Sequence, residues 1–374
     1  FWKHVYEPII RRSAGLGKAP DAETRDADRY EQLYAFCDVI VAGGGVAGLK
    51  AARKAADEGK RVILTEQNPH FGGRAVVDGA EVDGQPAEEW VKAQVAALQA
   101  MPNVAVLDRT MVSGVYDHGY VLAYQRIADH TPGADKPRHR LWRVRAGHVI
   151  SATGAIERPL SFAGNDIPGV MLASAIRDFV VNYAVSPGKK VAIVTNNDDA
   201  YRTALALHAV GVTVPAVIDA RKEATGDLPA RVRAAGIRVI EDCAVRYVEG
   251  GKSVTGVQLC RFNSDGGAVI ETLACDALGM SGGWSPVVHL WSHCGGKLIW
   301  DENGHFFRPE DLAGFRIRRG HNLGGQIIWR CSGGDLRRPR GGQFSDQAAD
   351  GPGCRLSAAG VEARHPFGQR QQRA

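Results

Sequence analysis

The stretch CDVIVAGGGVAGLKAA, residues 37–52, joins an apolar strand to an amphipathic helix through a glycine-rich turn. Gly43, Gly45 and Gly48 have the spacing G-x-G-x-x-G. In this context the first glycine makes the tight turn, the second lets the backbone approach a pyrophosphate, and the third lets the helix pack on the strand. The amides at the start of the helix favour an anion. The stretch therefore predicts a dinucleotide site.

A carboxylate follows at the end of the next expected strand, RVILTE (61–66). Glu66 lies 18 residues after Gly48, where an acidic side chain accepts hydrogen bonds from the adenosine ribose. A 2′-phosphate would meet the same negative charge, so NAD or FAD is favoured over NADP. The fingerprint reads the half that NAD and FAD share and leaves both open. The ordinary alternative is a glycine-rich turn that holds no ligand.

Two further segments are expected near this turn. FGGR (71–74) is a glycine loop able to approach the same ligand, or else a surface turn, and ATG (152–154) ends a strand that returns beneath the site. We expect no metal, and no catalytic residue is identifiable. The predicted cofactor-binding residues are Gly43, Gly45, Val46, Ala47, Gly48, Glu66, Gly73, Arg74, Thr153 and Gly154.

A second strand-to-helix passage, KVAIVTNNDDAY (190–201), lacks the glycines. The side chains of Asn196 and Asn197 would obstruct close backbone approach, and Asp198 and Asp199 bring negative charge to the place of a diphosphate. Asp198 or Asp199 is expected instead as the helix N-cap. We therefore expect one bound dinucleotide, because the second unit keeps its fold and loses its pyrophosphate site.

The alternation of strands and helices predicts an α/β protein with parallel sheets. Its fold class is a three-layer, FAD/NAD(P)-binding Rossmann-like fold with an inserted second dinucleotide-binding-like domain. Residues 111–150 read as short antiparallel strands that return to the first sheet. The expected divisions are a linker or interdomain wrap with a short helix (1–35), the dinucleotide-binding domain (36–160 and 276–307), the degenerate second domain (161–275) and a tail (308–374).

Length and composition bound the class of protein. With 374 residues and 44% apolar content the chain has material for two cores. No apolar run is long enough to span a membrane, and the start lacks both a signal peptide and Met, so we expect a cytoplasmic piece of something longer. The seven cysteines are scattered, without C-x-x-C, which argues against disulfides, zinc and a redox dithiol.

Other candidates for chemistry are weak. His289 and His293 are four residues apart and would form a metal pair on a helix, but no third ligand accompanies them, so packing is favoured. Trp284 and Pro286 are expected to cap the inner edge of the first domain. No nucleophile with a neighbouring base stands out.

The tail after residue 308 has a different character, with twelve Arg against six Asp and Glu and a high glycine content. One interpretation is a disordered Arg/Gly segment that touches RNA. The favoured interpretation is a wrong-frame or otherwise non-native continuation, because the expected sheet-closing segment is missing. Without the tail the net charge of +5 disappears, so we expect no nucleic-acid partner.

The sequence resembles the alpha subunits of heterotetrameric sarcosine oxidase and related opine and cyanide-forming amine oxidoreductases, over residues 1 to about 307. The resemblance rests on FWKHVYEPIIRRSAGLGKAP, YEQLYAFCDVIVAGGGVAGL, ATGAIERPLSFAGNDIPGVMLASAIR, TNNDDAYRTALALHAVGVTVPAVIDAR and GMSGGWSPVVHLWSHCGGKLIWDE. It implies an NAD held noncovalently at the glycine motif, where Gly43, Gly45, Gly48 and Glu66 carry over as ligands.

The resemblance also implies a complex with small subunits and a flavin-bearing beta subunit, in which FAD and FMN act and sarcosine, a small amine, is oxidatively demethylated. The family's N-terminal domain and its long C-terminal, folate-binding half have no counterpart here. The chain is thus interpreted as an alpha-subunit fragment. The enzyme-class alternative is a stand-alone FAD-dependent oxidoreductase with two dinucleotide-type domains, and the third alternative binds nucleic acid through the tail.

Overall fold

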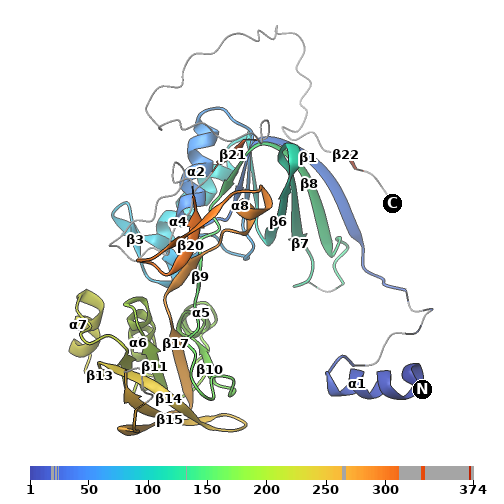
Figure 1. Cartoon of the computed structure of the whole chain (residues 1–374). Coiled ribbons are helices and arrows are strands. Elements are labelled where there is room, and N and C mark those ends of the chain that lie inside the picture. Colours follow the sequence, from blue (N-terminus) through green and yellow to red (C-terminus); the bar gives the residue numbers. More distant parts are fainter. Residues whose placement is uncertain are drawn as a thin grey trace, which may run out of the picture.

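The computed structural model describes residues 1–17, 21, 23, 25–131, 133–262 and 267–310, and the backbone of β21 (Arg330–Ser332) and β22 (Arg370–Gln371). Within these residues the predicted α/β fold is confirmed: two α/β units follow one another, joined by two strands that run between them (Figure 1). The tail, apart from residues 308–310 and these two strands, lies outside the described part of the chain.

The first sheet has the strand order β5-β2-β1-β8-β7-β6. Strands β5, β2, β1 and β8 are parallel, and β8, β7 and β6 are antiparallel, as predicted for residues 111–150. The 3-10 turn η2 (Asp117–Gly119) joins β6 to β7. The strands are β1 (Tyr30–Ala42), β2 (Val62–Thr65), β5 (Val104–Leu107), β6 (Thr110–Tyr116), β7 (Tyr120–Arg126) and β8 (His139–Ser151).

Helices α2 (Val46–Asp57) and α4 (Ala87–Gln99) cover one face of the parallel part. Their small and apolar side chains, including Leu49, Ala52 and Trp90, pack on Val39 and Val41 of β1 in one buried cluster. The short helix α3 (Arg74–Val77) and the hairpin β3 (Glu81–Val82) and β4 (Gln85–Pro86) lie between α2 and α4 in sequence. This packing fixes the N-terminus of α2 at the carboxyl edge of the sheet.

Strands β1 and β8 are each 13 residues long, so they reach beyond the parallel part and also carry the antiparallel extension. On one face of the extension, Leu33, Trp142 and Val144 are buried with Leu290 of helix α8 (His289–His293). The opposite face alternates with it and is largely exposed. The two long strands therefore connect the site to a second, distant sheet surface.

The second unit has three layers. Its parallel sheet has the order β10-β17-β11-β12-β13, with helices on one face and a three-stranded antiparallel sheet, β14-β15-β16, on the other. The strands are β10 (Val170–Leu172), β11 (Val191–Thr195), β12 (Val217–Asp219), β13 (Val239–Ile240), β14 (Cys243–Gly250), β15 (Val254–Arg261), β16 (Glu271–Ala274) and β17 (Ala277–Ser281). The helices are α5 (Ala173–Tyr183), α6 (Asp199–Ala209) and α7 (Asp227–Ala234).

The return to the first unit lies later than expected. The sequence places it at residue 276, but β17 (Ala277–Ser281) pairs with β10 and β11 and so closes the second sheet. The chain crosses back in β18 (Trp284–Pro286), which pairs with the outgoing strand β9 (Ala155–Glu157). The hairpin of β19 (Leu298–Asp301) and β20 (Phe306–Pro309) follows, and it runs past the expected boundary at 307. Central strands read the same whichever sheet they join, so pairing decides.

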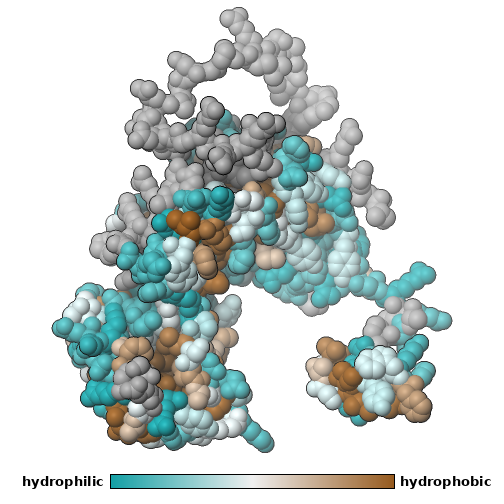
Figure 2. Space-filling view, viewed as in Figure 1, coloured by the Kyte–Doolittle hydropathy of each residue, from teal (hydrophilic) through white to brown (hydrophobic). Residues whose placement is uncertain are grey.

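The N-terminal segment contains the expected short helix, α1 (Glu7–Ser13), preceded by the π-helical turn η1 (Trp2–Tyr6). No residue of either element is buried, so the expected interdomain wrap is not what these residues form. Apolar side chains such as Trp2 and Ile9 lie on the surface of this helix (Figure 2, lower right). Among the described residues, no helix is both long and apolar enough to cross a membrane.

Candidate functional site

A cavity of about 560 Å³ opens at the carboxyl edge of the first sheet, where β1, β2 and β8 end. Nine of the ten predicted cofactor-binding residues line it, and these are Gly43, Gly45, Val46, Ala47, Glu66, Gly73, Arg74, Thr153 and Gly154. Gly48 lies behind the turn and is not part of the lining. Segments from four distant parts of the sequence thus meet around one space.

The three glycines of the motif are needed for three different reasons. Gly43 has φ +108°, and a Cβ there would overlap the carbonyl of Ala152. A Cβ on Gly48 would overlap the carbonyl of Gly43, because helix and strand touch there. Gly45 has an ordinary φ of −68° and no protein atom within 4 Å of the position of a Cβ. Backbone strain does not explain Gly45, whereas the close approach of a ligand would.

Glu66 is held in place by the backbone around it. It is 5% exposed, and its two carboxylate oxygens accept hydrogen bonds from the amides of Gly44 (2.8 Å) and Asn68 (2.9 Å). These bonds tie the end of β2 to the glycine turn. Each oxygen keeps a further lone pair, so the carboxylate can also accept bonds from hydroxyl groups in the cavity.

The loop FGGR packs directly on the glycine turn. The amide of Gly72 donates to the carbonyl of Gly44 at 2.8 Å, and a Cβ on Gly73 would lie 3.4 Å from the Cα of Gly45. Both Gly72 and Gly73 have positive φ, of +101° and +54°, which glycine adopts without strain. The predicted approach of this loop to the turn is therefore present in the fold.

Arg74 lines the cavity, but its guanidinium is engaged elsewhere. Its Nη1 contacts both carboxylate oxygens of Asp178 at 2.7 and 2.8 Å, and its Nη2 lies 2.9 Å from Asp78. The guanidinium also lies 5.8 Å from the centre of a Trp284 ring. Because two carboxylates neutralise the charge, Arg74 joins the cavity to the second unit rather than presenting a free cation to a diphosphate.

The inner end of the cavity is formed where the chain crosses between the units. The hydroxyl of Thr153 donates to the carbonyl of Val287 at 3.0 Å, next to Gly154. Trp284, His289 and His293 complete this end. We expected Trp284 to cap the domain edge and the histidines to pack, and all three line the cavity instead. A tryptophan after two glycines was the signal available in the sequence.

The opposite end was missed by sequence reasoning. Gln67 and Asn68 follow Glu66, and the first residues of β6, from Thr110 to Ser113, lie beside them. The amide of Thr110 donates to the carbonyl of Glu66 at 2.7 Å, which brings β6 against the end of β2. The residues of β6 show no motif, so only the fold reveals their place.

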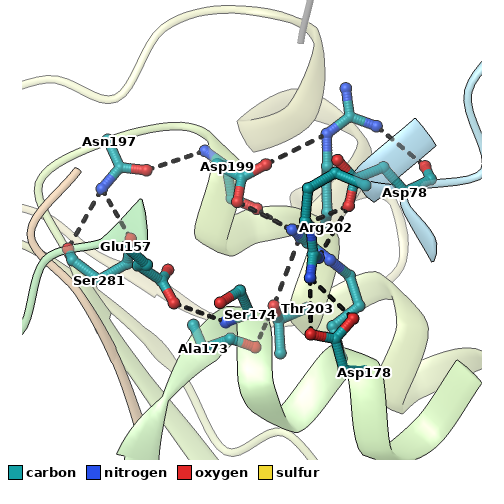
Figure 3. Close-up of polar contacts among 12 residues, drawn as sticks. Asp78, Glu157, Ala173, Ser174, Asp178, Asn197, Asp199, Arg202, Thr203 and Ser281 are labelled. Carbon is teal, nitrogen blue, oxygen red and sulfur yellow. Dashed lines mark hydrogen bonds and ion pairs between the residues drawn. The ribbon is translucent and has the colours of Figure 1, made fainter. Parts of the chain in front are cut away.

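The glycine-free second turn is filled by its own side chains (Figure 3). The side-chain amide of Asn197 donates to the carbonyl and hydroxyl of Ser281 at 3.2 and 3.0 Å, and its oxygen accepts the amide of Asp199 at 3.1 Å. Asn197 therefore supplies the cap of α6. Asp198 occupies the N-cap position without a capping bond and pairs with Arg221 at 2.8 Å, so the expected carboxylate cap was wrong.

A buried ion network connects this turn to the first unit (Figure 3). Arg177 of α5 is 1% exposed and contacts Asp199 at 2.9 Å and Asp78 at 3.0 Å. Asp78 belongs to the first unit, where it caps α3, and Arg202 of α6 donates to its carbonyl at 3.2 Å. Burial raises the pKa of Asp78, against the effect of Arg177 and Arg74. The network occupies the space beside the N-terminus of α6 and binds the two units together.

Thiol and metal chemistry find no support in the described part of the chain. Its five cysteines are free, and burial raises the pKa of Cys37 to about 12 and that of Cys275 to about 11, which keeps both thiols protonated. No group of three or more His, Cys, Asp and Glu among the described residues could hold a metal ion.

Comparisons with known proteins agree with this geometry. Residues 38–154 match the family model described as FAD dependent oxidoreductase. Over 322 residues the chain is 41% identical to the alpha subunit of sarcosine oxidase from Rhizobium meliloti (strain 1021), and the match covers 85% of this chain. The chain is a relative of the sarcosine oxidase alpha subunits. The predicted resemblance is thereby confirmed.

Two further similarities are more distant. The opine oxidase protein of Rhizobium meliloti that corresponds to this chain is 25% identical over 326 residues, covering 80% of this chain and 60% of that protein. The crystal structure of L-proline dehydrogenase from P. horikoshii superposes with a TM-score of 0.56 at 23% identity, over 80% of this chain and 52% of that one, and it shows the fold alone. The chain spans about a third of the sarcosine oxidase alpha subunit, 31% of the Rhizobium meliloti protein.

Proposed function

We propose that this chain is the dinucleotide-binding part of the alpha subunit of a sarcosine oxidase-type complex, and that it holds NAD at the turn of Gly43, Gly45 and Gly48. The observation that carries the proposal is the open space beside Gly45, at the N-terminus of α2 and next to the carboxylate of Glu66. A diphosphate placed there receives the amides of Val46 and Ala47, and Glu66 accepts bonds from the ribose.

The chain's own residues bind and orient the cofactor in this proposal. Glu66 fixes the adenosine end and disfavours a 2′-phosphate, while Thr153, Gly154 and Trp284 border the other half of the molecule. A nicotinamide or flavin ring, when bound, supplies hydride transfer. The oxidation of a small amine such as sarcosine takes place at the flavin of a partner beta subunit, with FAD and FMN in the complex, and small subunits complete it.

A second candidate function uses the same site for FAD, in a stand-alone oxidoreductase. The match of residues 38–154 to the FAD dependent oxidoreductase model favours it. Both candidates share one dinucleotide, because Asn197 and the Arg177 network fill the second turn. The proposal places the protein in the cytoplasm, where buried thiols such as Cys37 and Cys275 stay reduced.

The test is the identity of the cofactor released from the purified protein by denaturation. A colourless supernatant that contains a compound with the mass of NAD supports the alpha-subunit proposal. A yellow supernatant with the mass of FAD supports the stand-alone flavoprotein. If nothing is released, calorimetric titration with NAD and FAD decides, and failure of both to bind would show that the cavity is not a dinucleotide site.

A further inference from the structure

The outer face of the antiparallel extension has an unusual composition. In register, Tyr34 and Phe36 of β1 lie beside Arg143 and Arg145 of β8, and Tyr120 of β7 lies on the other side of Arg145. Paired residues on neighbouring strands point to the same side of a sheet. The aromatic-arginine face is therefore defined here by Tyr34, Phe36, Tyr116, Tyr120, Leu122, Arg143 and Arg145.

Large aromatic side chains remain in solvent on this face. Phe36 is 50% exposed and Tyr116 is 53% exposed, whereas the alternate residues Ala35, Val121 and Val144 are at most 1% exposed. The strands thus bury one face completely and leave the other open. An exposed aromatic patch on an otherwise well-packed sheet is typical of an interaction site.

The two arginines carry charge without an acidic neighbour. Arg143 lies 5.4 Å from the Tyr34 ring and donates to its hydroxyl at 2.7 Å, and Arg145 lies 4.8 Å from the Tyr120 ring. Neither forms an ion pair within the described residues, in contrast to Arg140 on the inner face, which pairs with Glu31 at 2.8 Å. The face therefore presents two positioned cations within an aromatic surface.

We propose that the aromatic-arginine face is a docking surface for a partner protein that presents carboxylates among apolar side chains. Tyrosine and arginine are enriched at the energetic centres of protein interfaces, and stacking on rings holds the guanidinium planes ready for bidentate pairing with carboxylates. The inference rests on the proposed function only in requiring a partner subunit. Binding at the face does not depend on which dinucleotide the cavity holds.

The experiment compares the reactivity of arginines in the assembled complex and in the separate subunit. The complex is purified from its native source through a tag on the full-length protein, and both samples are treated with phenylglyoxal and analysed by peptide mass spectrometry. Arg143 and Arg145 should react several-fold more slowly in the complex. Arg231 on α7, whose side chain is 60% exposed, is the control and should react equally in both.

A charge reversal completes the test. The double variant Arg143→Glu and Arg145→Glu should weaken assembly about tenfold or more, because like charges then face each other across the interface. The control Arg231→Glu should assemble normally, and both variants should keep the cofactor and the melting temperature of the parent protein. The double variant Arg143→Gln and Arg145→Gln, which keeps the hydrogen-bonding length, replaces the reversal if the latter does not fold.

Four results would overturn the inference. These are equal reactivity of Arg143 and Arg145 in both samples, a native protein that purifies without any partner, protection that arises in a pure homodimer, and protection that nuclease treatment removes. The last two would assign the face to a second copy or to nucleic acid. Since cofactor release is measured separately, failure here leaves the dinucleotide proposal standing, and failure there leaves this face to be judged by its own data.

Discussion

Gly45 and Gly48 separate ligand binding from folding at the level of single residues. Gly45→Val adds a side chain in open space, so we expect an unchanged melting temperature and loss of dinucleotide binding. Gly48→Ala places a methyl group against the carbonyl of Gly43, and overpacking of this kind costs about 1–3 kcal/mol of stability. Differential scanning fluorimetry and calorimetric titration measure the two effects. A Gly45→Val protein that still binds the dinucleotide would contradict our placement of the ligand.

Glu157 should make stability depend on pH. Its carboxyl is 6% exposed, and burial raises its pKa above the ordinary 4.5, although hydrogen bonds from Ser174 act in the opposite direction. The folded state therefore holds the proton more tightly than the unfolded state, and stability from this group is lost as pH rises through the raised pKa. Glu157→Gln keeps an oxygen for the Ser174 amide and cannot ionise.

We therefore expect the free energy of unfolding of Glu157→Gln to gain on the parent protein as pH rises above about 4.5, measured by denaturant titration. Glu271 is the control with the opposite sign, because the hydrogen bonds of Arg238 lower its pKa. Glu271→Gln should lose stability relative to the parent over the pH range in which Glu271 ionises. A difference for Glu157→Gln that does not change with pH would disprove the assignment.

Among the elements, helix α5 depends on a single buried cation. Arg177→Met removes the partner of Asp78 and Asp199 and leaves their carboxylates buried, which costs about 3–5 kcal/mol. The matched control is Arg238→Met, since Arg238 is 54% exposed in its pair with Glu271 and such pairs contribute about 0–1 kcal/mol. Chemical denaturation measures both. Equal losses in the two variants would show that the network is not a stabilising unit.

The sequence predicted elements well and their pairing less well. The glycine turn, α2 and Glu66 follow from local spacing, because each role is fixed by neighbours in the chain. The sheet that takes β17 and the position of Thr110 at the cavity depend on hydrogen bonds between distant segments. The capping of α6 by Asn197 was missed because either an asparagine or an aspartate suits that turn, and only the ion pairs decide which is free.

At the scale of the whole molecule, Arg74 links the cavity to the second unit. Asp178→Asn removes one of its two carboxylate partners, so the guanidinium retains more charge beside the cavity. We expect the affinity for an anionic dinucleotide to rise by about 1 kcal/mol, roughly fivefold. Isothermal titration measures it, with Asp227→Asn as the control for net charge, since Asp227 is 81% exposed on α7. An unchanged affinity would mean that the two units do not communicate through Arg74.

The length of β1 has a consequence for how such chains can vary. Thirteen residues span about 43 Å, with the glycine turn after one end and the aromatic-arginine face near the other. One residue inserted just before Cys37 would exchange the two faces for everything before it, turning Tyr34 into the core and Leu33 into water. Insertions and deletions in this half of the strand are therefore tolerated only in steps of two residues, matched by the same change in β8.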